Sequence, residues 1–324
     1  MNRYLFFATL ICMVIILLPF KTHATFKSAK VTLIVVGEDG VPLEGVDAGI
    51  GFEKNTGWGT NASAKRGLTD ADGRFTATGK CNGHIGYGAR KEGFYRSHLD
   101  YDFKNVGAFG WEPWNPELKI VMRKIENPVA MYARDVKTSK KKIELPVLGQ
   151  EVGFDLEAYD WVAPYGVGKT VDFIFNATKS VRDKRDFDVK VVLSFPNKGD
   201  GIVTIQEDLK SGSEFKLPRF APEAEYATHK LFEEHRRPEK EIVRSFEQDD
   251  SYVFRVRSTY KDGKLVKAKY GKIHGPIFID ANWTKTVRVY LKYYFNPDGT
   301  RNLEFDVNRN LFENLSPMER VGIK

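Results

Sequence analysis

The stretch KVTLIVVGEDG, residues 30–40, runs from β-branched apolar residues into a turn. Valine and isoleucine favour strands because their branched side chains pack well on a pleated surface. The closing glycine suits a tight turn because it adopts positive φ angles at little cost. The stretch therefore predicts a buried strand that ends in a tight turn.

On the C-terminal side of this strand, apolar and polar residues alternate along the chain. Strand-like stretches separated by glycine and aspartate turns follow it, and no long amphipathic helix interrupts them: PLEGVDAGIGFE (42–53), GLTDADGRFTATGK (67–80), HIGYGARKEGFYRSHLDYDF (84–103) and LKIVMRKI (118–125). Short strands at regular spacing predict a β-sandwich of about 100 residues. We place this first domain at residues 27–125.

Three motifs of this block stand in a characteristic order: EDGVPLEGV (38–46), TDADGRF (69–75) and KEGF (91–94). In this order they resemble a carboxypeptidase regulatory-like domain over about residues 28–124. The resemblance implies a transthyretin-like β-sandwich that serves as an accessory or adhesive module, with no catalytic residue to transfer. The segment EKNTGWGTNASAKR (53–66) departs from the family pattern because it is longer and richer in glycine.

The remainder of the chain reads as a linker followed by a second β-rich domain. Residues 126–150 carry two prolines and the basic cluster KTSKKK (137–142), which predicts a solvated linker. Residues 151–324 contain further alternating stretches and the hairpin signal YKDGKL (260–265). Residues 127–324 are similar to the C-terminal part of uncharacterised exported bacterial proteins, a resemblance that implies no activity.

One segment of the second domain breaks the strand pattern. Helix-forming residues follow Pro222 from Glu223 to Arg236, and Pro238 comes after them. Proline is tolerated at a helix start and ends a helix that reaches it. The predicted fold class is thus all-β, with two β-sandwich-like domains, the second carrying a short helical insertion at 223–236.

The N-terminus predicts export. Arg3 precedes an apolar run from Leu5 to Leu18, Pro19 breaks it, and Ala24 supplies a small residue at the exit. This order indicates a signal peptide over residues 1–24, because the run is shorter than the roughly 20 residues of a spanning helix. An uncleaved membrane anchor is the alternative. The expected location is the periplasm, the outer surface or the medium, with membrane contact only through export.

Charge and cysteine content narrow the class of protein. Cleavage would leave 300 of the 324 residues and, by removing Arg3 and Lys21, lower the net charge from +7 to +5. Basic and acidic residues are interleaved, whereas nucleic-acid binders concentrate their basic charge, so we expect no nucleic-acid partner. Only Cys81 would remain, which excludes an internal disulfide and a cysteine-based zinc site. We interpret Cys81 as a small buried apolar residue rather than a reactive thiol.

The stretch APYGVGKT, residues 163–170, fits a relaxed phosphate-loop pattern. Phosphate binding by such a loop requires a helix directly after it. Val171, Phe173 and Phe175 instead alternate with polar or smaller residues, which favours a strand. We therefore expect no nucleotide and no cofactor.

The remaining candidate residues concern metal and partner binding. On the predicted helix, Glu225, His229 and Glu233 would share one face and could hold a divalent ion, although such rows are more often solvated. Tryptophans in loops offer large faces for stacking on a sugar or gripping a peptide. The candidates lie in or beside glycine-rich and proline-rich stretches: Trp58, Trp111, Trp114 and Trp161. The alternative for these tryptophans is that they fill the interface between the two domains.

These observations favour a non-enzymatic, exported binding or structural protein of the cell envelope, with a glycan or an envelope protein as partner. A secreted hydrolase is the alternative, with its site near the helical insertion and built from Glu225, His229, Glu233 or His235. A structural subunit of a surface assembly is a third possibility.

Overall fold

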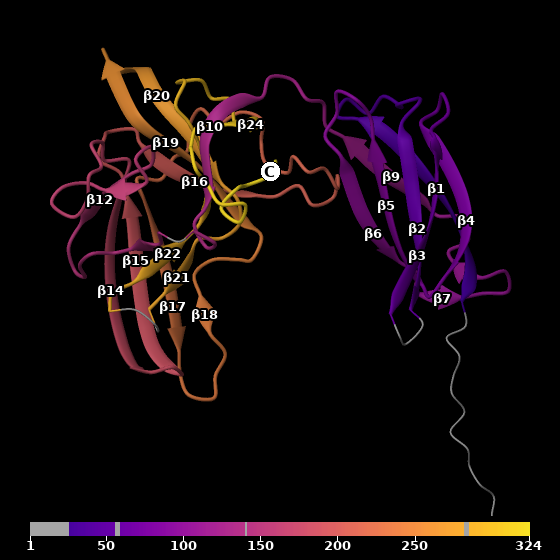
Figure 1. The fold of residues 1–324 in the computed structure, drawn as a ribbon, viewed down its shortest axis with the longest axis horizontal. Helices are drawn as coiled ribbons and strands as arrows, with labels where there is room; N and C mark the ends of the chain where they lie inside the picture. Colours follow the sequence, from indigo (N-terminus) through magenta and orange to yellow (C-terminus); the bar gives the residue numbers. More distant parts are fainter. Residues whose placement is uncertain (1–25, 56–58, 140, 282–284) are drawn as a thin grey trace, which may run out of the picture.

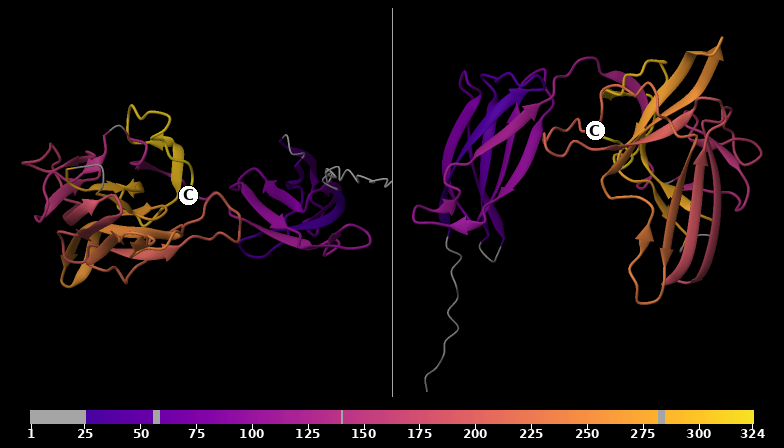
Figure 2. Two further views of the ribbon diagram at one scale, coloured as in Figure 1. Left: turned by 90° about the horizontal axis from the view of Figure 1, so that it is seen from below. Right: turned by 180° about the vertical axis from the view of Figure 1, so that it is seen from behind.

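The computed structural model describes residues 26–55, 59–139, 141–281 and 285–324. This described part consists of strands, turns and loops without any helix, which confirms the all-β class. Two lobes lie beside each other, a first lobe of residues 26–125 and a second lobe of residues 126–324 (Figures 1 and 2). Over the residues described, no helix is long and apolar enough to span a bilayer.

The first lobe contains two sheets around one core. Alternate side chains of the strands point into this core, which includes Val31, Leu33, Ile50, Phe52 and the fully buried Cys81. Burial raises the pKa of the Cys81 thiol. The sheets have the orders β4-β1-β9 and β3-β2-β5-β6. Their strands are β1 (Lys27–Gly37), β2 (Asp47–Asn55), β3 (Thr60–Leu68), β4 (Arg74–Cys81), β5 (His84–Arg90), β6 (Ser97–Asp102) and β9 (Glu117–Met122).

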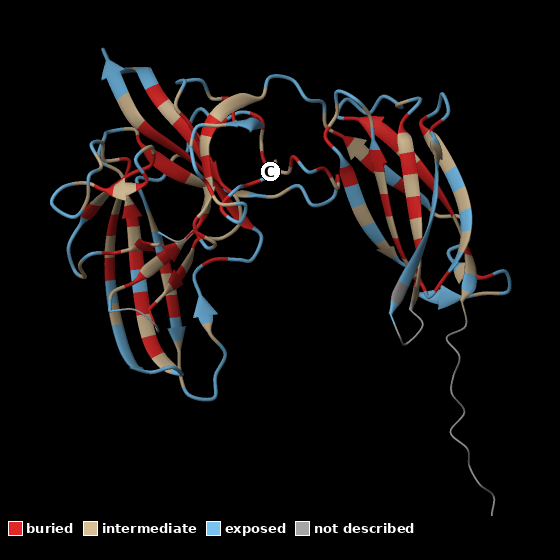
Figure 3. Cartoon of the chain, viewed as in Figure 1, coloured by how far each residue is buried: buried red, intermediate tan, exposed pale blue. Residues whose placement is uncertain are grey.

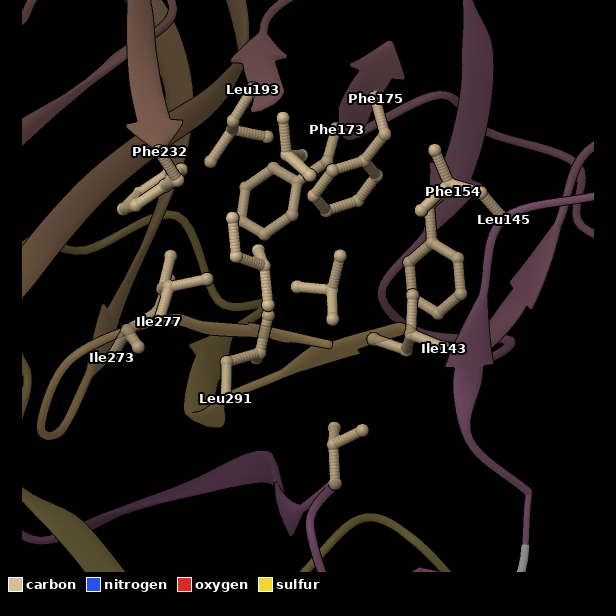
Figure 4. Close-up of a cluster of buried hydrophobic side chains, with 14 of the residues drawn as sticks. Ile143, Leu145, Phe154, Phe173, Phe175, Leu193, Phe232, Ile273, Ile277 and Leu291 are labelled. Carbon is tan, nitrogen blue, oxygen red and sulfur yellow. The ribbon is translucent and has the colours of Figure 1, made fainter. Parts of the chain in front are cut away.

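The second lobe contains two larger sheets and one small sheet. Its core is rich in aromatic rings, and Figure 4 shows Phe154, Phe173, Phe175 and Phe232 among the aliphatic residues of this cluster. One large sheet has the order β13-β12-β14-β15-β17-β18, the other β16-β19-β20-β23-β10-β24, and the small one β11-β22-β21. The strands are β10 (Val129–Asp135), β11 (Ile143–Glu144), β12 (Val152–Asp155), β13 (Asp160–Trp161), β14 (Phe173–Asp183), β15 (Asp186–Ser194), β16 (Gly201–Gln206), β17 (His229–Arg236), β18 (Val243–Arg244), β19 (Asp250–Lys261), β20 (Lys264–Ile273), β21 (Phe278–Asp280), β22 (Arg288–Tyr290), β23 (Lys292–Asn296) and β24 (Phe305–Asn310).

The segment 126–150, which we expected to be a linker, contributes strands to the second lobe. β10 pairs with β23, with Tyr132 opposite Phe295, and β11 pairs with β22. Met131 and Ala133 of β10 are fully buried. Isolated prolines and a lysine cluster therefore did not mark an unstructured stretch.

The predicted helix at 223–236 is wrong. Residues 221–228 form an irregular segment with one isolated bridge, and β17 then pairs with β15 from His229 opposite Ser194 to Arg236 opposite Phe187. Phe232 of β17 is fully buried in the core. Helix propensity is a weak preference, and pairing with a central strand and burial of Phe232 override it.

The stretch that resembles a phosphate loop is a turn held by a carboxylate of the protein itself. Asp155 Oδ2 accepts hydrogen bonds from the amides of Lys169, at 2.9 Å, and Thr170, at 3.0 Å. The chain then continues into β14 rather than into a helix. The amides that would face a phosphate are thus already occupied.

A loop of the second lobe, residues 207–218, extends to the first lobe and continues its sheet. The amide of His98 donates to the Gly212 carbonyl at 2.8 Å, and the amide of Glu214 donates to the Arg96 carbonyl at 2.9 Å. Several residues of this loop are buried where it meets the first lobe (Figure 3). The second lobe therefore adds a short backbone pairing to the start of β6.

Glu304 is the centre of the junction between the lobes and is completely inaccessible to solvent. It accepts hydrogen bonds from the Tyr95 hydroxyl at 2.8 Å and from the amides of Glu126 and Asn127, and it lies 2.9 Å from Arg219 Nη1. Burial alone would raise the pKa of Glu304, but these bonds outweigh it and hold the pKa below its usual value. The junction therefore contains a buried carboxylate that stays ionised.

Lys272 is also buried at this junction. Its ammonium lies 4.8 Å from the centre of the Phe215 ring and 5.1 Å from that of Tyr294, and it donates to the Lys324 carbonyl. Burial, with the nearby charge of Arg123, lowers the pKa of Lys272 to about 7. The loop, the C-terminal residues and β20 thus enclose the Lys272 amine together.

Candidate functional site

A short hairpin at one end of the first lobe carries the two tryptophans of the GAFGWEPWNP stretch. It consists of β7 (Asn105–Val106) and β8 (Trp111–Glu112), with the amide of Gly107 bonded to the Gly110 carbonyl at 2.7 Å. Gly110 has a φ of 144° and lies against the Ser28 backbone, where a side chain would collide. The glycine therefore lets the hairpin rest on the start of β1.

Trp111 anchors this hairpin rather than facing solvent. Its indole Nε1 donates to the Cys81 carbonyl at 3.0 Å, and its ring lies beside Phe103, with 6.2 Å between the ring centres. A Cβ atom at Gly83 would come within 2.9 Å of the indole, so that position has to be glycine for Trp111 to fit. Strand β8 of the hairpin is thereby fixed to the core.

The hairpin and the residues just after it expose large apolar side chains. Phe109 at the tip is 83% exposed, Val106 of β7 50%, and Trp114, two residues after β8, 43%; we call these three residues the hairpin patch. A pocket of about 550 Å³, rimmed by charged side chains, lies beside the hairpin and is lined by Tyr101, Asp102, Lys104, Asn105, Glu112 and Pro113. Exposed apolar groups with a polar surround are typical of binding surfaces.

His84 supplies the titratable group next to this pocket. Its Nδ1 lies 2.7 Å from Asp102, and its Nε2 lies 3.6 Å from Asp100. The hydrogen bond with Asp102 raises the pKa of His84, and the nearby carboxylates add to the effect although partial burial opposes it. Next to the pocket there are therefore two carboxylates, Asp100 and Asp102, and a histidine that protonates more readily than usual.

The structure separates the other predicted tryptophans from this site. Trp58 lies outside the described residues. Trp161 is buried in the second lobe, where its indole donates to the Glu144 carbonyl at 3.1 Å and its ring meets Phe154 edge-on. Figure 1 shows β7 at the end of the first lobe that is remote from the connection to the second lobe. Trp111 is paired with Val106 of β7, so it does not fill the interface between the lobes.

The proposed metal row is not brought together. His229 and Glu233 lie on a strand, where four residues span about 13 Å. Glu225 lies in the irregular segment before β17, and Glu233 is bonded to Lys190 at 2.6 Å. In the described ranges, no group of three or more metal-ligating side chains is assembled. The hydrolase alternative, which also used His235, thus loses the helix on which it was built.

Sequence reasoning missed Phe109 and Val106, the two most exposed members of the hairpin patch. A signal for Phe109 was present, because it stands in GAFG between glycines that form the tip of a turn. A large apolar residue at a turn tip has no neighbouring residues to bury it. The two tryptophans drew attention instead, and one of them proved to be the anchor.

No protein-family model and no curated protein matches this sequence. Among solved structures, the chain is similar to the 3-chlorocatechol 1,2-dioxygenase of Rhodococcus opacus 1CP, with 14% identity over 31% of this chain and 61% of the enzyme, at a TM-score of 0.25. It therefore spans less than two thirds of that enzyme.

Two pilin subunits are also similar to this chain. One is a point mutant of the shaft pilin SpaA of Lactobacillus rhamnosus GG, with 13% identity over 75% of this chain and 92% of the pilin, at a TM-score of 0.23. The other is BcpA, the major pilin subunit of Bacillus cereus, with 10% identity over 86% of this chain and all of the pilin, at a TM-score of 0.23. TM-scores this low do not establish a shared fold, and no functional conclusion follows from them.

Proposed function

We propose that this chain is an exported, non-enzymatic protein of the cell envelope that binds a glycan or a protein partner through the hairpin patch. The observation that carries the proposal is the contrast between Trp111, which fixes β8 to the core, and the exposed Phe109 at the tip of the same hairpin. A surface that is already ordered before binding loses little entropy on association. Large aromatic side chains on such a surface supply most of the binding energy.

The architecture proposed with this function is a pair of β-sandwich-like domains. In the first lobe, two sheets face each other across one core, which supports its assignment as a carboxypeptidase regulatory-like domain. In the second lobe, two six-stranded sheets contribute to one aromatic core. In the function we propose, the first lobe contacts the partner.

Removing both exposed rings, Phe109→Ser with Trp114→Ala, is expected to weaken partner binding at least about tenfold, because truncating such anchors costs more than about 1 kcal/mol each. The measurement is a glycan array together with crosslinking to envelope proteins, each performed with the wild type and the variant. The control is Val41→Ser, which removes a similarly exposed apolar side chain from a turn elsewhere in the first lobe. Unchanged binding by the double variant, with the fold intact, would refute the role of the patch.

Export is expected to remove residues 1–24. When the full chain is produced in a bacterial host, we expect the envelope or extracellular fraction to contain a chain that begins at Thr25, and deletion of residues 2–24 to leave the protein in the cytoplasm. The measurement is cell fractionation followed by N-terminal sequencing. A full-length chain in the membrane pellet would indicate an anchor, and a full-length chain in the cytoplasm would refute export.

A further inference from the structure

A groove of about 420 Å³ lies on the outer face of the sheet β3-β2-β5-β6, separate from the hairpin patch. Its floor consists of Gly49 and Gly51 of β2 and Gly86 and Gly88 of β5. The strand register places Gly49 opposite Gly88 and Gly51 opposite Gly86. The intervening residues Ile50 and Tyr87 point into the core, so all four glycines point outward.

The four glycines add no side chains of their own to this floor, and the Arg66 side chain and the His98 ring lie against its Gly49 and Gly86 corners. The floor measures about 7 Å along the strands and 5 Å across them, which is close to the size of one sugar ring. Both strands are paired on both sides within the sheet, so their backbone groups are engaged and the floor presents mainly Cα hydrogens. Such a floor suits the apolar face of a ring, whereas a peptide laid on it would gain no backbone hydrogen bonds.

The walls of the groove come from three parts of the chain. Ala62 and Ala64 of β3 form one side, His98 of β6 forms the other, and Glu214 of the 207–218 loop completes one end. The backbone bond between Glu214 and Arg96 fixes that end in place. The groove is therefore assembled from both lobes.

Three arginines that line the groove, Arg66, Arg90 and Arg96, supply its cationic end. Arg90 lies opposite Asp47 and Arg66 opposite Gly49, with the Arg66 Nε atom only 3.8 Å from where a Gly49 side chain would begin. Among the described residues, these three guanidinium groups make no hydrogen bond and no ion pair. Asp47 and Glu214 line the same groove and remain beyond ion-pair distance of them.

Unpaired guanidinium groups at the edge of a cavity are suited to bind an anion. Arginine presents a planar set of donors that matches both oxygens of a carboxylate, and such paired bonds are among the strongest available. Elsewhere in the chain Arg219 and Arg257 already engage buried carboxylates. The carboxylates of Glu53, Asp47 and Glu214 in the same groove would in turn accept hydroxyl protons.

We propose that this groove binds a sugar unit that carries a carboxylate, as a uronate or a sialate does. The ring lies on the four glycines, its carboxylate faces the arginines, and its hydroxyls bond the surrounding acidic side chains and His98. A ring that is apolar on one face and has hydroxyls around its edge matches both the bare floor and the charged rim. This inference does not depend on the hairpin patch.

The test is isothermal titration of the full mature chain with two matched pairs of probes. Tri-galacturonate is compared with neutral galactotriose, and sialyllactose with lactose, while a tetraglutamate peptide represents a plain acidic chain. We expect at least one acidic sugar to bind at least about tenfold more tightly than its neutral partner, and added salt to weaken that binding. Equal affinity within both pairs, tighter binding of the peptide, or no binding of either acidic sugar overturns the proposal.

Substitutions in the groove distinguish binding of the acidic sugar in the groove from a general attraction between opposite charges. Gly51→Val would fill the floor, and it is compatible with the fold because a Cβ atom there would meet only the Gly86 carbonyl, at 3.5 Å. We expect this variant to abolish binding of the acidic sugar, and Arg66→Ala or Arg90→Ala to weaken it about tenfold. The control is Lys65→Ala, which removes the same charge from the neighbouring residue of β3, on the opposite face of the strand.

The outcomes also distinguish this site from the proposed function. Acidic-sugar binding is expected to survive Phe109→Ser with Trp114→Ala, and the partner of the hairpin patch is expected to survive Gly51→Val. Wild-type affinity in Gly51→Val, with its fold confirmed by circular dichroism, would show that any sugar bound lies elsewhere and would refute the groove. Loss of binding in Lys65→Ala would likewise contradict it, because that side chain does not line the groove.

Discussion

Arg257→Ala is expected to lower the free energy of unfolding by about 3–5 kcal/mol, because it leaves a buried carboxylate without its partner. Asp172 is completely inaccessible, and Arg257 binds both of its oxygens, at 2.7 and 2.9 Å. The same guanidinium reaches Glu157 at 2.6 Å. The measurement is denaturant unfolding of the wild type and the variant at pH 7.

The loss caused by Arg257→Ala is expected to shrink in acid. Burial raises the pKa of Asp172 and Arg257 opposes this shift, so the pKa rises further without the arginine. A carboxyl group with a raised folded pKa favours the folded state below its unfolded pKa of about 4 and loses that contribution as pH rises through the folded pKa. The difference in the free energy of unfolding between the wild type and Arg257→Ala is therefore expected to be largest at neutral pH.

A second substitution provides the control for this experiment. Adding Asp172→Asn to Arg257→Ala removes the buried charge and is expected to recover part of the stability at pH 7. If Arg257→Ala lowered the free energy of unfolding by less than about 1 kcal/mol, or by the same amount at pH 4 and pH 7, the ion pair of Arg257 and Asp172 would not be buried as described.

Glu304→Ala is expected to cost a similar amount, about 3–5 kcal/mol, and also to uncouple the two lobes. It removes the acceptor for Tyr95 of the first lobe and leaves the largely buried Arg219 without its buried partner. Urea unfolding is expected to change from one transition to two, and small-angle scattering to show a larger radius of gyration. These measurements report the stability of the junction and the relative placement of the lobes separately.

Glu126→Ala is the matched control for Glu304→Ala. Glu126 also faces Arg219, at 3.4 Å, but its side chain is 49% exposed, so its loss is expected to cost less than about 1 kcal/mol. Two coincident lobe transitions in Glu304→Ala, or equal losses for the two variants, would contradict a junction that depends on the buried carboxylate.

The sequence predicted the β class because its signals are local. Residues 30–37 form β1 as expected, and alternation and turn signals identified β2, β4, β5, β6 and β9, but not β3, which lies mostly in the glycine-rich segment 53–66. The segment 223–236 was misread because its preference for helix is also local, while pairing between β17 and β15 depends on residues about 40 positions away. Local propensity decides the secondary structure of a segment only where pairing with distant strands does not compete with it.

The two candidate sites differ in how far the sequence revealed them. The stretch GAFGWEPWNP indicated a loop with two tryptophans, but not that it forms a hairpin, nor which aromatic residue anchors it and which is exposed. The alternating glycines of GHIGYGAR were visible as well, yet their role required knowing that Gly86 and Gly88 lie opposite Gly51 and Gly49. Register between strands that are 35 residues apart cannot be obtained from composition or spacing.

The pairing of the 207–218 loop with β6 has a consequence for how the chain can be divided. A strand at a sheet edge presents free amide and carbonyl groups that recruit strands of other molecules. In the intact chain the start of this edge, at Arg96 and His98, is occupied by the chain's own backbone. A fragment that ends at residue 125 would leave these groups open to pairing between copies, so the second lobe also protects the first against self-association.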